Sequence, residues 1–265
     1  MARRNAGLQT AALMLALNLL SASAGLAATP ARTDTAASEL AEMAIEELLQ
    51  LEVVSVSKGP QRRHHAPAAV HVITTEDIRR AGVLSIPEAL RLAPGVQVAR
   101  INANKWAVSV RGFNSLYAQK LLVLLDGKTA YTPLVSGVHW EELDIPVENI
   151  ARIEVIRGPA AAFWGANAVN GVINIITKPS AETQGGLFSV TTGTNWKIRG
   201  LARYGGRLSD AGHYRVYAKY ARHNAFRTPD GHAAEDDWRS RRTGFRADWN
   251  LDGEDHFELQ GHLYE

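Results

Sequence analysis

The stretch that most constrains the fold of this chain runs from Arg152 to Lys178. Two short runs rich in Ile and Val, residues 152–156 and 172–177, flank a connector of small residues. Each run is too short for a core helix and rich in β-branched residues, so both are predicted to be strands. A phosphate-binding loop is excluded, because no Lys-Ser/Thr pair follows Gly171 and the connector leads into a strand.

The start of the chain is typical of a secretory signal peptide. Arg3 and Arg4 precede an apolar run at residues 11–20, and small residues follow through Ala27. The apolar run is too short to span a bilayer as a helix, so export of residues 1–27 is favoured over a membrane anchor. Two of the 29 Lys and Arg residues lie in this leader, so the mature chain is formally neutral against its 27 Asp and Glu. Its charge gives no indication of nucleic-acid binding.

Catalytic and metal-binding motifs are not found in the sequence. The chain has no cysteine, which excludes disulfides and thiolate metal sites. It has no Gly-x-Ser-x-Gly, no His-Glu-x-x-His and no dinucleotide-binding fingerprint, so no catalytic residue and no cofactor are predicted and an enzyme is disfavoured. The adjacent His64 and His65 are assigned to a solvated loop rather than to a metal site, because two sequence neighbours rarely supply a full ligand set.

The mature chain is predicted to begin with a flexible segment at residues 28–50, which contains a short amphipathic helix at 39–49. Residues 51–58 are different, because they form a β-prone run followed by Gly59 and Pro60. Such a strand can add to the sheet edge of another protein, although an ordinary first strand is the alternative.

Residues 59–180 mix short strands with short helices. Beyond a polar loop at 61–67, strands are predicted at 69–74, 96–100, 106–110 and 120–125. One helix is predicted at 75–82, capped by Thr74 or Thr75 and ended by Gly82, and a second after Ser85 that stops at Pro94.

From Gly185 onward, apolar and polar residues alternate with a period of two in strands of about ten residues, the signature of a transmembrane barrel. A soluble β-sandwich shows the same alternation, but the position of this segment behind an export signal favours the barrel. The apolar phase includes Trp196 and Tyr204, which are expected to face outward. Turns at 205–212 and 252–255 are expected on the periplasmic side, and the long loop at 225–238 outside.

Several ordered motifs resemble the plug domain of TonB-dependent outer-membrane receptors. They include Ile-Glu-Val-Ile-Arg-Gly-Pro from Ile153, Trp164-Gly165, and Asn-Gly-Val-Ile-Asn-Ile-Ile-Thr from Asn170, preceded by Val-Arg-Gly-Phe and Leu-Val-Leu-Leu-Asp-Gly. The resemblance covers residues 51–178. It implies an α+β plug domain, a small mixed β-sheet with short helices, at 59–180, followed at 181–265 by the start of an antiparallel transmembrane β-barrel. A barrel of this family has about 22 strands, and only about five are expected here, so the sequence resembles the first part of a longer receptor.

The resemblance implies energised uptake of a large scarce ligand, such as a ferric siderophore or cobalamin. The receptor would lie in the outer membrane of a Gram-negative bacterium, in contact with outer-membrane lipid, with its plug and N-terminus towards the periplasm. Its N-terminal strand would pair with TonB, which ExbB and ExbD energise. The residues that match this TonB-interacting strand are Leu51, Glu52, Val53, Val54, Ser55 and Val56.

Arg111 and Arg157 match family arginines that pair with glutamates of the barrel and lock the plug; ordinary solvent-facing arginines are the alternative. The loops at 102–106, 113–119 and 131–140 resemble the apical loops of the family. Their aromatic residues could form a floor for the ligand or pack the plug against the barrel wall; these are Trp106, Phe113, Tyr117, Tyr131 and Trp140. A signalling or interaction module without transport is the second hypothesis, and a passive porin is the third.

Overall fold

The computed structural model describes residues 52–53, 61–62 and 69–265, with the exception of 119, 133, 135–136, 159, 166 and 252–254. These residues belong to one structural unit that begins at Leu49. The predicted signal peptide, the segment 28–50 with its helix, and Leu51, Val54, Ser55 and Val56 lie outside the described residues. No helix in the described part of the chain has the length and apolar character needed to cross a membrane.

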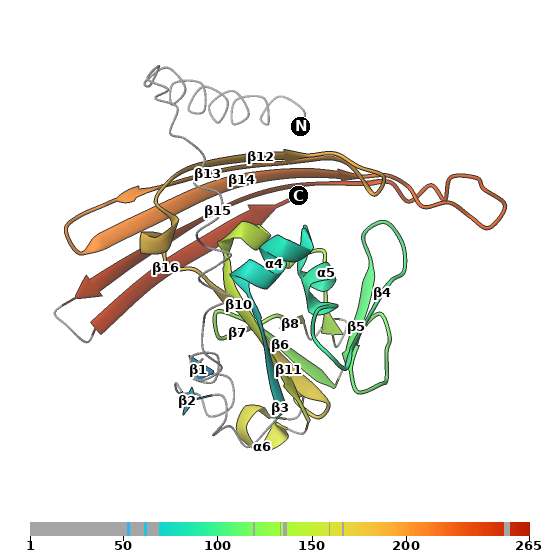
Figure 1. The fold of residues 1–265 in the computed structure, drawn as a ribbon, viewed down its shortest axis with the longest axis horizontal. Helices are drawn as coiled ribbons and strands as arrows, with labels where there is room; N and C mark the ends of the chain where they lie inside the picture. The colour runs from blue at the N-terminus through green and yellow to red at the C-terminus, as the bar shows by residue number, and fades with distance from the viewer. Residues whose placement is uncertain are drawn as a thin grey trace. The chain divides into compact units, whose positions relative to one another are not determined.

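The first part of the described chain is built on a mixed five-stranded sheet (Figure 1). We call residues 69–179 the plug, after the domain they resemble. In the sheet, β11 and β6 are parallel and the other neighbours are antiparallel. The strand order is β3 (Ala69–Thr74), β10 (Ile150–Arg157), β11 (Gly171–Thr177), β6 (Leu121–Leu125) and β7 (Lys128–Thr129). The predicted strands at both ends of the 152–178 stretch are therefore confirmed, and they pair with each other.

Two short helices follow β3, as predicted. Helix α4 (Thr75–Ala81) starts at Thr74, which exchanges hydrogen bonds with Asp77 in a capping box, and it ends at Gly82 in the left-handed conformation. Helix α5 (Ile86–Leu90) is capped by the Ser85 hydroxyl. It ends four residues before Pro94, earlier than the sequence suggests.

The remaining plug elements are small. Strands β4 (Val96–Arg100) and β5 (Trp106–Val110) form the predicted hairpin. The other short plug elements are β8 (Tyr131–Thr132), β9 (Gly137–Val138), η2 (Val147–Asn149) and α6 (Ala161–Trp164), and η3 (Ser180–Thr183) follows the plug. Near the N-terminus, β1 (Glu52–Val53) pairs with β2 (Gln61–Arg62), so the loop expected at 61–67 begins with two strand residues.

Two hydrophobic clusters stabilise the plug sheet from its opposite faces. The larger one includes Ile153 and Val155 of β10 and packs against α4, α5 and the β4–β5 hairpin. The smaller one includes Ile156 and Val172 and contacts Trp164 of α6. Burial of large aliphatic side chains on both faces explains why the central strands form continuous apolar runs.

The second part of the chain is a five-stranded antiparallel sheet in which neighbours in the chain are neighbours in space (Figure 1). We call this sheet the wall. It comprises β12 (Gly185–Thr191), β13 (Trp196–Arg207), β14 (Gly212–His223), β15 (Trp238–Leu251) and β16 (Asp255–Tyr264). The five strands and the long connection between β14 and β15 agree with the period-two pattern.

One residue of that pattern was assigned to the wrong face. Tyr204 is exposed on the outer side of the wall as expected, but Trp196 is buried against His223, with ring centroids 3.8 Å apart. The pairing of β13 with β14 shifts between Trp196 and Ile198. A bulge adds one residue to a strand, and one residue is enough to turn a side chain to the opposite face.

Candidate functional site at the plug–wall interface

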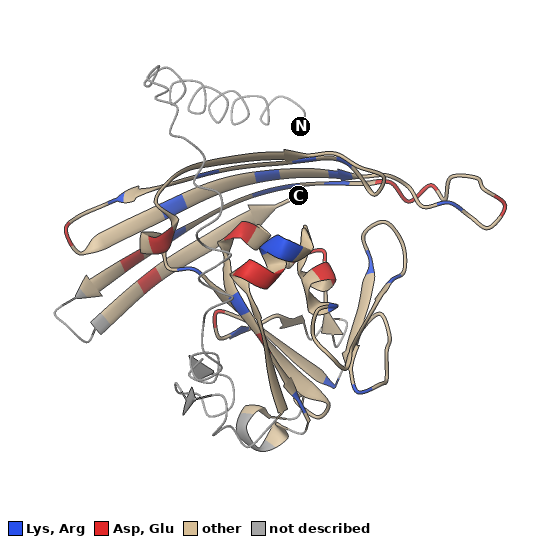
Figure 2. Ribbon diagram, in the orientation of Figure 1, with Lys and Arg blue, Asp and Glu red and all other residues tan. Residues whose placement is uncertain are grey.

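The side of the wall that faces the plug carries a repeated set of cationic side chains. They come from three adjacent strands, where the basic segments are visible in Figure 2. The two cationic residues of each strand are four positions apart, so they lie on the same face of the sheet. This polar face points towards the plug. These residues are Arg199 and Arg203 on β13, Arg215 and Lys219 on β14, and Arg242 and Arg246 on β15.

Arg199 forms the best-defined contact across the interface. Its guanidinium donates two hydrogen bonds, of 3.0 and 2.9 Å, to the two carboxylate oxygens of Glu148 in η2. The Arg199 side chain is 0% exposed and that of Glu148 is 25% exposed. Burial tends to raise the pKa of Glu148, but the hydrogen bonds and charge of Arg199 outweigh it and hold that pKa below its ordinary value.

Two further contacts surround this pair. The Lys219 ammonium lies 2.6 Å from the Asp144 carboxylate and donates to the Asp144 carbonyl oxygen at 3.2 Å. Arg203 donates to the amide oxygen of Asn149 at 2.9 Å. Segment 144–149 of the plug is therefore fastened to β13 and β14 by hydrogen bonds and ion pairs.

The end of β11 is held by a second network. The Thr177 hydroxyl donates to Asp126 at 2.9 Å and accepts from Arg215 at 3.1 Å and from Arg246 at 2.8 Å. Arg246 also contacts Asp248, and Asp248 accepts the Ser180 backbone N–H at 2.7 Å. The segment that connects the plug to the wall is thus held by charged side chains of both parts.

A third contact joins the plug hairpin to the long loop at residues 224–237. The two carboxylate oxygens of Asp236 accept the backbone N–H groups of Ala103 and Phe226, both at 2.8 Å. Arg100 donates a hydrogen bond to the Ala103 carbonyl oxygen at 2.7 Å. Its guanidinium carbon lies over the Phe226 ring, 4.8 Å from the ring centroid. Asp236 therefore ties the hairpin tip to the loop.

None of these interface residues was singled out from the sequence. The polar phase of the wall strands was visible, and its excess of Lys and Arg over acids is the signal that could have identified them. Their plug partners follow no local pattern, because Glu148 and Asp144 lie 51 and 75 residues away from Arg199 and Lys219.

Arg111 and Arg157, predicted to lock the plug, lie at one end of it. Arg111 follows β5 with a positive φ of 60°, and its backbone N–H bonds to the Gly95 carbonyl oxygen. Arg157 donates to the Pro94 carbonyl oxygen at 3.2 Å and covers Gly95. The structure therefore brings the two arginines to the same turn after Pro94. Among the described residues neither makes an ion pair, so their role as locks stays a prediction.

The five predicted aromatic residues are not brought together as one surface. Trp106 and Trp140 are buried in the main plug core. Phe113 is 72% exposed and lies under the Lys120 ammonium, whereas Tyr117 stacks edge-on against His139. Tyr131 is half-buried in β8. Contact of these residues with a ligand stays a prediction, and the exposed Phe113 is the most accessible of them.

One group of metal-type ligands occurs in the described residues. Atoms of Asp248, His256 and Glu258 lie within 4.8 Å of one another. Arg246 already contacts Asp248 and Glu258, both at 2.9 Å, and so supplies the positive charge at this position. The group is therefore better described as an arginine–carboxylate cluster.

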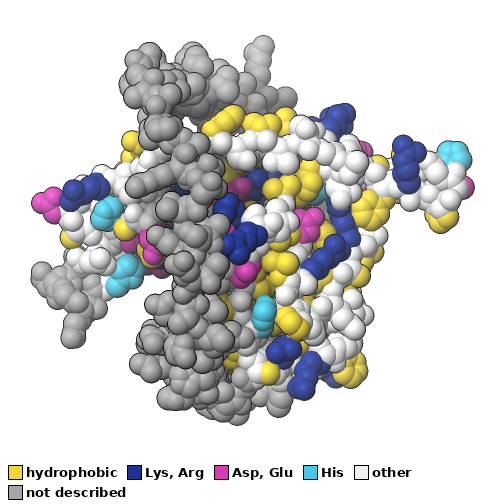
Figure 3. Space-filling view, in the orientation of Figure 1, with side chains coloured by type: hydrophobic (Ala, Val, Ile, Leu, Met, Phe, Trp, Pro, Cys, Tyr) yellow, Lys and Arg dark blue, Asp and Glu magenta, His cyan; other side chains and the backbone are white. Residues whose placement is uncertain are grey.

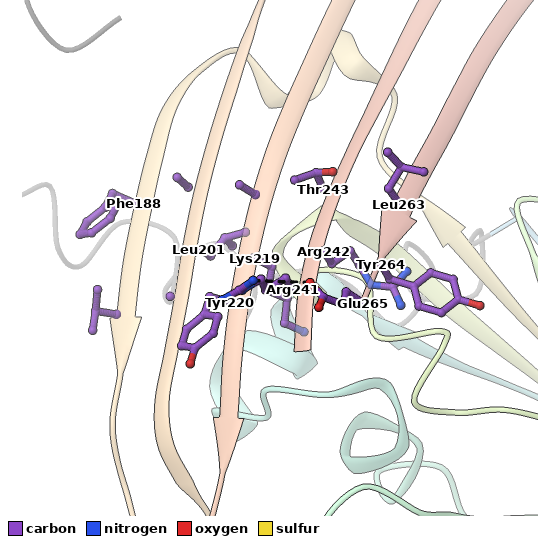
Figure 4. Close-up of a pocket in the computed structure, with 14 residues that line it drawn as sticks. Phe188, Leu201, Lys219, Tyr220, Arg241, Arg242, Thr243, Leu263, Tyr264 and Glu265 are labelled. Atoms are coloured by element: carbon purple, nitrogen blue, oxygen red, sulfur yellow. Dashed lines mark hydrogen bonds and ion pairs between the residues drawn. The ribbon is translucent and has the colours of Figure 1, made fainter. Parts of the chain in front are cut away.

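The opposite side of the wall is apolar. It contains a hollow of about 590 Å³ over the small residues Gly200, Ala202 and Ala218 of β13 and β14 (Figure 4). Phe188 and Leu263 flank it from the strands on either side, and Arg241 and Glu265 also line it. On the face in Figure 3, lysine and arginine side chains reach the surface in separate small groups. The wall thus has an apolar outer side and a cationic plug-facing side.

Both parts of the chain are similar to known proteins. Residues 62–172 match the family model described as TonB-dependent Receptor Plug Domain. The vitamin B12 transporter BtuB of Vibrio vulnificus is 32% identical over 145 residues, which are 54% of this chain and 23% of that protein. The chain therefore spans about a quarter of the length of the curated relatives it matches.

Solved structures agree with the fold. The siderophore receptor PirA from Acinetobacter baumannii matches with a TM-score of 0.56 and 27% identity, covering 74% of this chain and 31% of that one. The pyoverdine-bound FpvA of P. aeruginosa, at 17% identity, shows the fold alone, with a TM-score of 0.62 over 80% of this chain and 27% of that one. Residues 62–172 therefore match the plug domain of TonB-dependent receptors, and the plug and the wall together have the fold of the corresponding part of a solved siderophore receptor.

Proposed function

We propose that the protein is an outer-membrane receptor that takes up a large scarce ligand, a ferric siderophore or cobalamin, with energy delivered through TonB. The match of residues 62–172 to the plug family carries this proposal, because a plug fastened to barrel strands is a device for closing a pore. The printed names of similar proteins, a vitamin B12 transporter and a siderophore receptor, supply the two ligand classes.

The interface chemistry is suited to a plug that has to move. Leaving one member of a buried ion pair such as Arg199–Glu148 without its partner costs about 3–5 kcal/mol. The plug is therefore stably docked against the wall in the absence of an applied force. Polar groups can exchange their partners for water once water enters, whereas a broad apolar interface would lose its burial. Pulling on the plug can therefore separate these contacts one after another.

We assign the pulling point to Leu51–Val56, as the family resemblance implies. Two residues of this run, Glu52 and Val53, pair with Gln61 and Arg62. A two-residue ladder is short, so a longer ladder with TonB would replace it at little cost. In this proposal Arg111 and Arg157 lock the plug, the exposed aromatic residues of the plug loops meet the ligand, and the loop at 224–237 faces outside.

Uptake measurements test the proposal. Cells that express the protein from its own gene are supplied with radiolabelled ferric siderophore or cyanocobalamin, with and without TonB. We expect uptake of one ligand class to require TonB. The variant Val54→Pro should abolish uptake but keep surface binding, because proline removes a ladder donor. Val54→Ile is the matched control, since it keeps both the donor and the β-branched side chain. Energy-independent uptake, or normal uptake by Val54→Pro, would contradict the proposal and favour a passive pore or a signalling module.

A further inference from the structure

The plug-facing side of the wall carries more positive charge than its own acids balance. Six cationic side chains face the plug from β13, β14 and β15, and five of them are buried. The wall offers only Asp248 and Glu258 as carboxylates on this side among the residues that the structure describes, and both are bound to Arg246.

The cations are also placed side by side. Arg215 is the direct ladder partner of Arg246, and Lys219 is the direct partner of Arg242. Like charges directly opposite each other destabilise an antiparallel pair. This arrangement works against the stability of the wall, which indicates a purpose other than holding the sheet together.

The plug compensates these charges only in part. It supplies carboxylates to Arg199, Lys219 and Arg246. The other three cations have neutral acceptors in the described residues: Arg203 bonds to the Asn149 amide, and Arg215 and Arg242 bond to backbone carbonyls of Lys178 and Glu142.

Some donors at this surface have no acceptor at all within the described part of the chain. The Arg199 Nε, Arg203 Nε and Arg242 Nη1 groups are buried without a hydrogen-bond partner. Arg199 and Arg242 are more than nine-tenths buried. A buried donor without an acceptor is costly, and an incoming oxygen-rich anion would remove that cost.

We propose that the plug-facing wall is an anion-binding surface over which the ligand passes when the plug shifts, and that the ligand is therefore an anionic metal chelate. Its carboxylate or catecholate oxygens would accept hydrogen bonds from the guanidinium and ammonium groups that the plug releases, in the bidentate geometry that arginine favours. A neutral corrinoid gains nothing from this surface. The inference rests on the proposed function and selects the ferric siderophore class within it.

Ion selectivity tests the surface without knowledge of the ligand. Protein purified from its own membrane is inserted into a planar bilayer, urea is added until the plug opens, and the reversal potential is measured across a KCl gradient. We expect a pore that prefers chloride. The variants Arg203→Gln and Arg215→Gln should together lower the chloride preference about twofold or more. Arg241→Gln is the matched control, because Arg241 lies exposed next to Arg242 and belongs to the outer phase of β15.

Arg203 and Arg215 are chosen because their partners are neutral, so that neither substitution leaves a buried charge unpaired. If the double variant does not fold, as judged by heat-modifiable migration, the half-buried Arg203 alone is replaced. A pore that prefers potassium, or variants that behave like Arg241→Gln, would overturn the inference.

Transport separates this inference from the proposed function. Ferric enterobactin, an anionic catecholate chelate, and cyanocobalamin, which is neutral, are compared as labelled ligands. TonB-dependent uptake of the ferric chelate, slowed in the Arg203 and Arg215 variants without loss of surface binding, supports the inference. TonB-dependent uptake of cyanocobalamin alone contradicts it and leaves the proposed function intact. Uptake of neither ligand contradicts the proposed function.

Discussion

Replacing Glu148 by alanine is expected to loosen the plug from the wall. The change deprives a fully buried guanidinium of its carboxylate partner, since Arg199 is 0% exposed. Removing one member of a buried pair costs about 3–5 kcal/mol. Glu148 is 25% exposed, so water can enter and the lower limit of about 3 kcal/mol applies. A loss of that size shifts the docking equilibrium about a hundredfold.

Hydrogen exchange of the plug measures this loosening. The Lys178 backbone N–H, which donates to the Asn149 carbonyl oxygen at 2.8 Å, reports on the segment next to Glu148. Glu76→Ala is the control, because Glu76 is a plug acid that pairs, among the described residues, with Arg79 and Arg80 of α4 and not with the wall. Exchange in Glu148→Ala no faster than in this control would refute the reasoning.

A double variant separates the lost pair from a general defect. Glu148→Met combined with Arg199→Leu removes both charges, and replacing a buried pair by apolar residues is often neutral or stabilising. Exchange should therefore return towards the wild-type rate. If the double variant is as loose as Glu148→Ala, the unpaired guanidinium is not the cause.

The same pair predicts an acid response. Because the pKa of Glu148 in the folded protein lies below its ordinary 4.5, its stabilising contribution is present above that value and is lost as the pH falls through the lower folded value. The protection factor of the Lys178 amide, which is the ratio of its intrinsic to its observed exchange rate at each pH, should therefore fall below pH 4.5 in the wild type. The double variant should lack this component, and an equal acid response in both proteins would contradict the assignment.

Three further outcomes are expected. Arg111→Ala with Arg157→Ala should increase sensitivity to large antibiotics and proteolysis of the plug, and unchanged values for both would contradict the lock. Asp236→Asn should weaken the anchoring of the long loop, so that proteases cut the loop faster while the plug sheet keeps its protection; equal cleavage would show that the carboxylate is dispensable. Gly171→Ala should lower plug stability by about 1–3 kcal/mol in thermal unfolding, because a Cβ there would overlap the Ile156 carbonyl oxygen, whereas Gly186→Ala, with open space, should be neutral.

Local features of the fold could be predicted from the sequence because their causes are local. The capping box of α4 joins Thr74 to Asp77, and Gly82 ends the helix, all within nine residues. The wall strands follow from a period of two, which every strand with one apolar side has to show. The plug motifs gave the family resemblance for the same reason, since they are contiguous in the chain.

The candidate site depended on tertiary structure. The sequence placed Arg199 and Lys219 on the polar phase of their strands, but it could not identify Glu148 and Asp144 as their partners, because the docking of the plug decides which distant residues meet. Trp196 shows the same limit within one strand, where a register shift of one residue reversed the side it faces. Periodicity along the chain therefore determined which residues share a face, and only the packing of the plug against the wall decided what each face contacts.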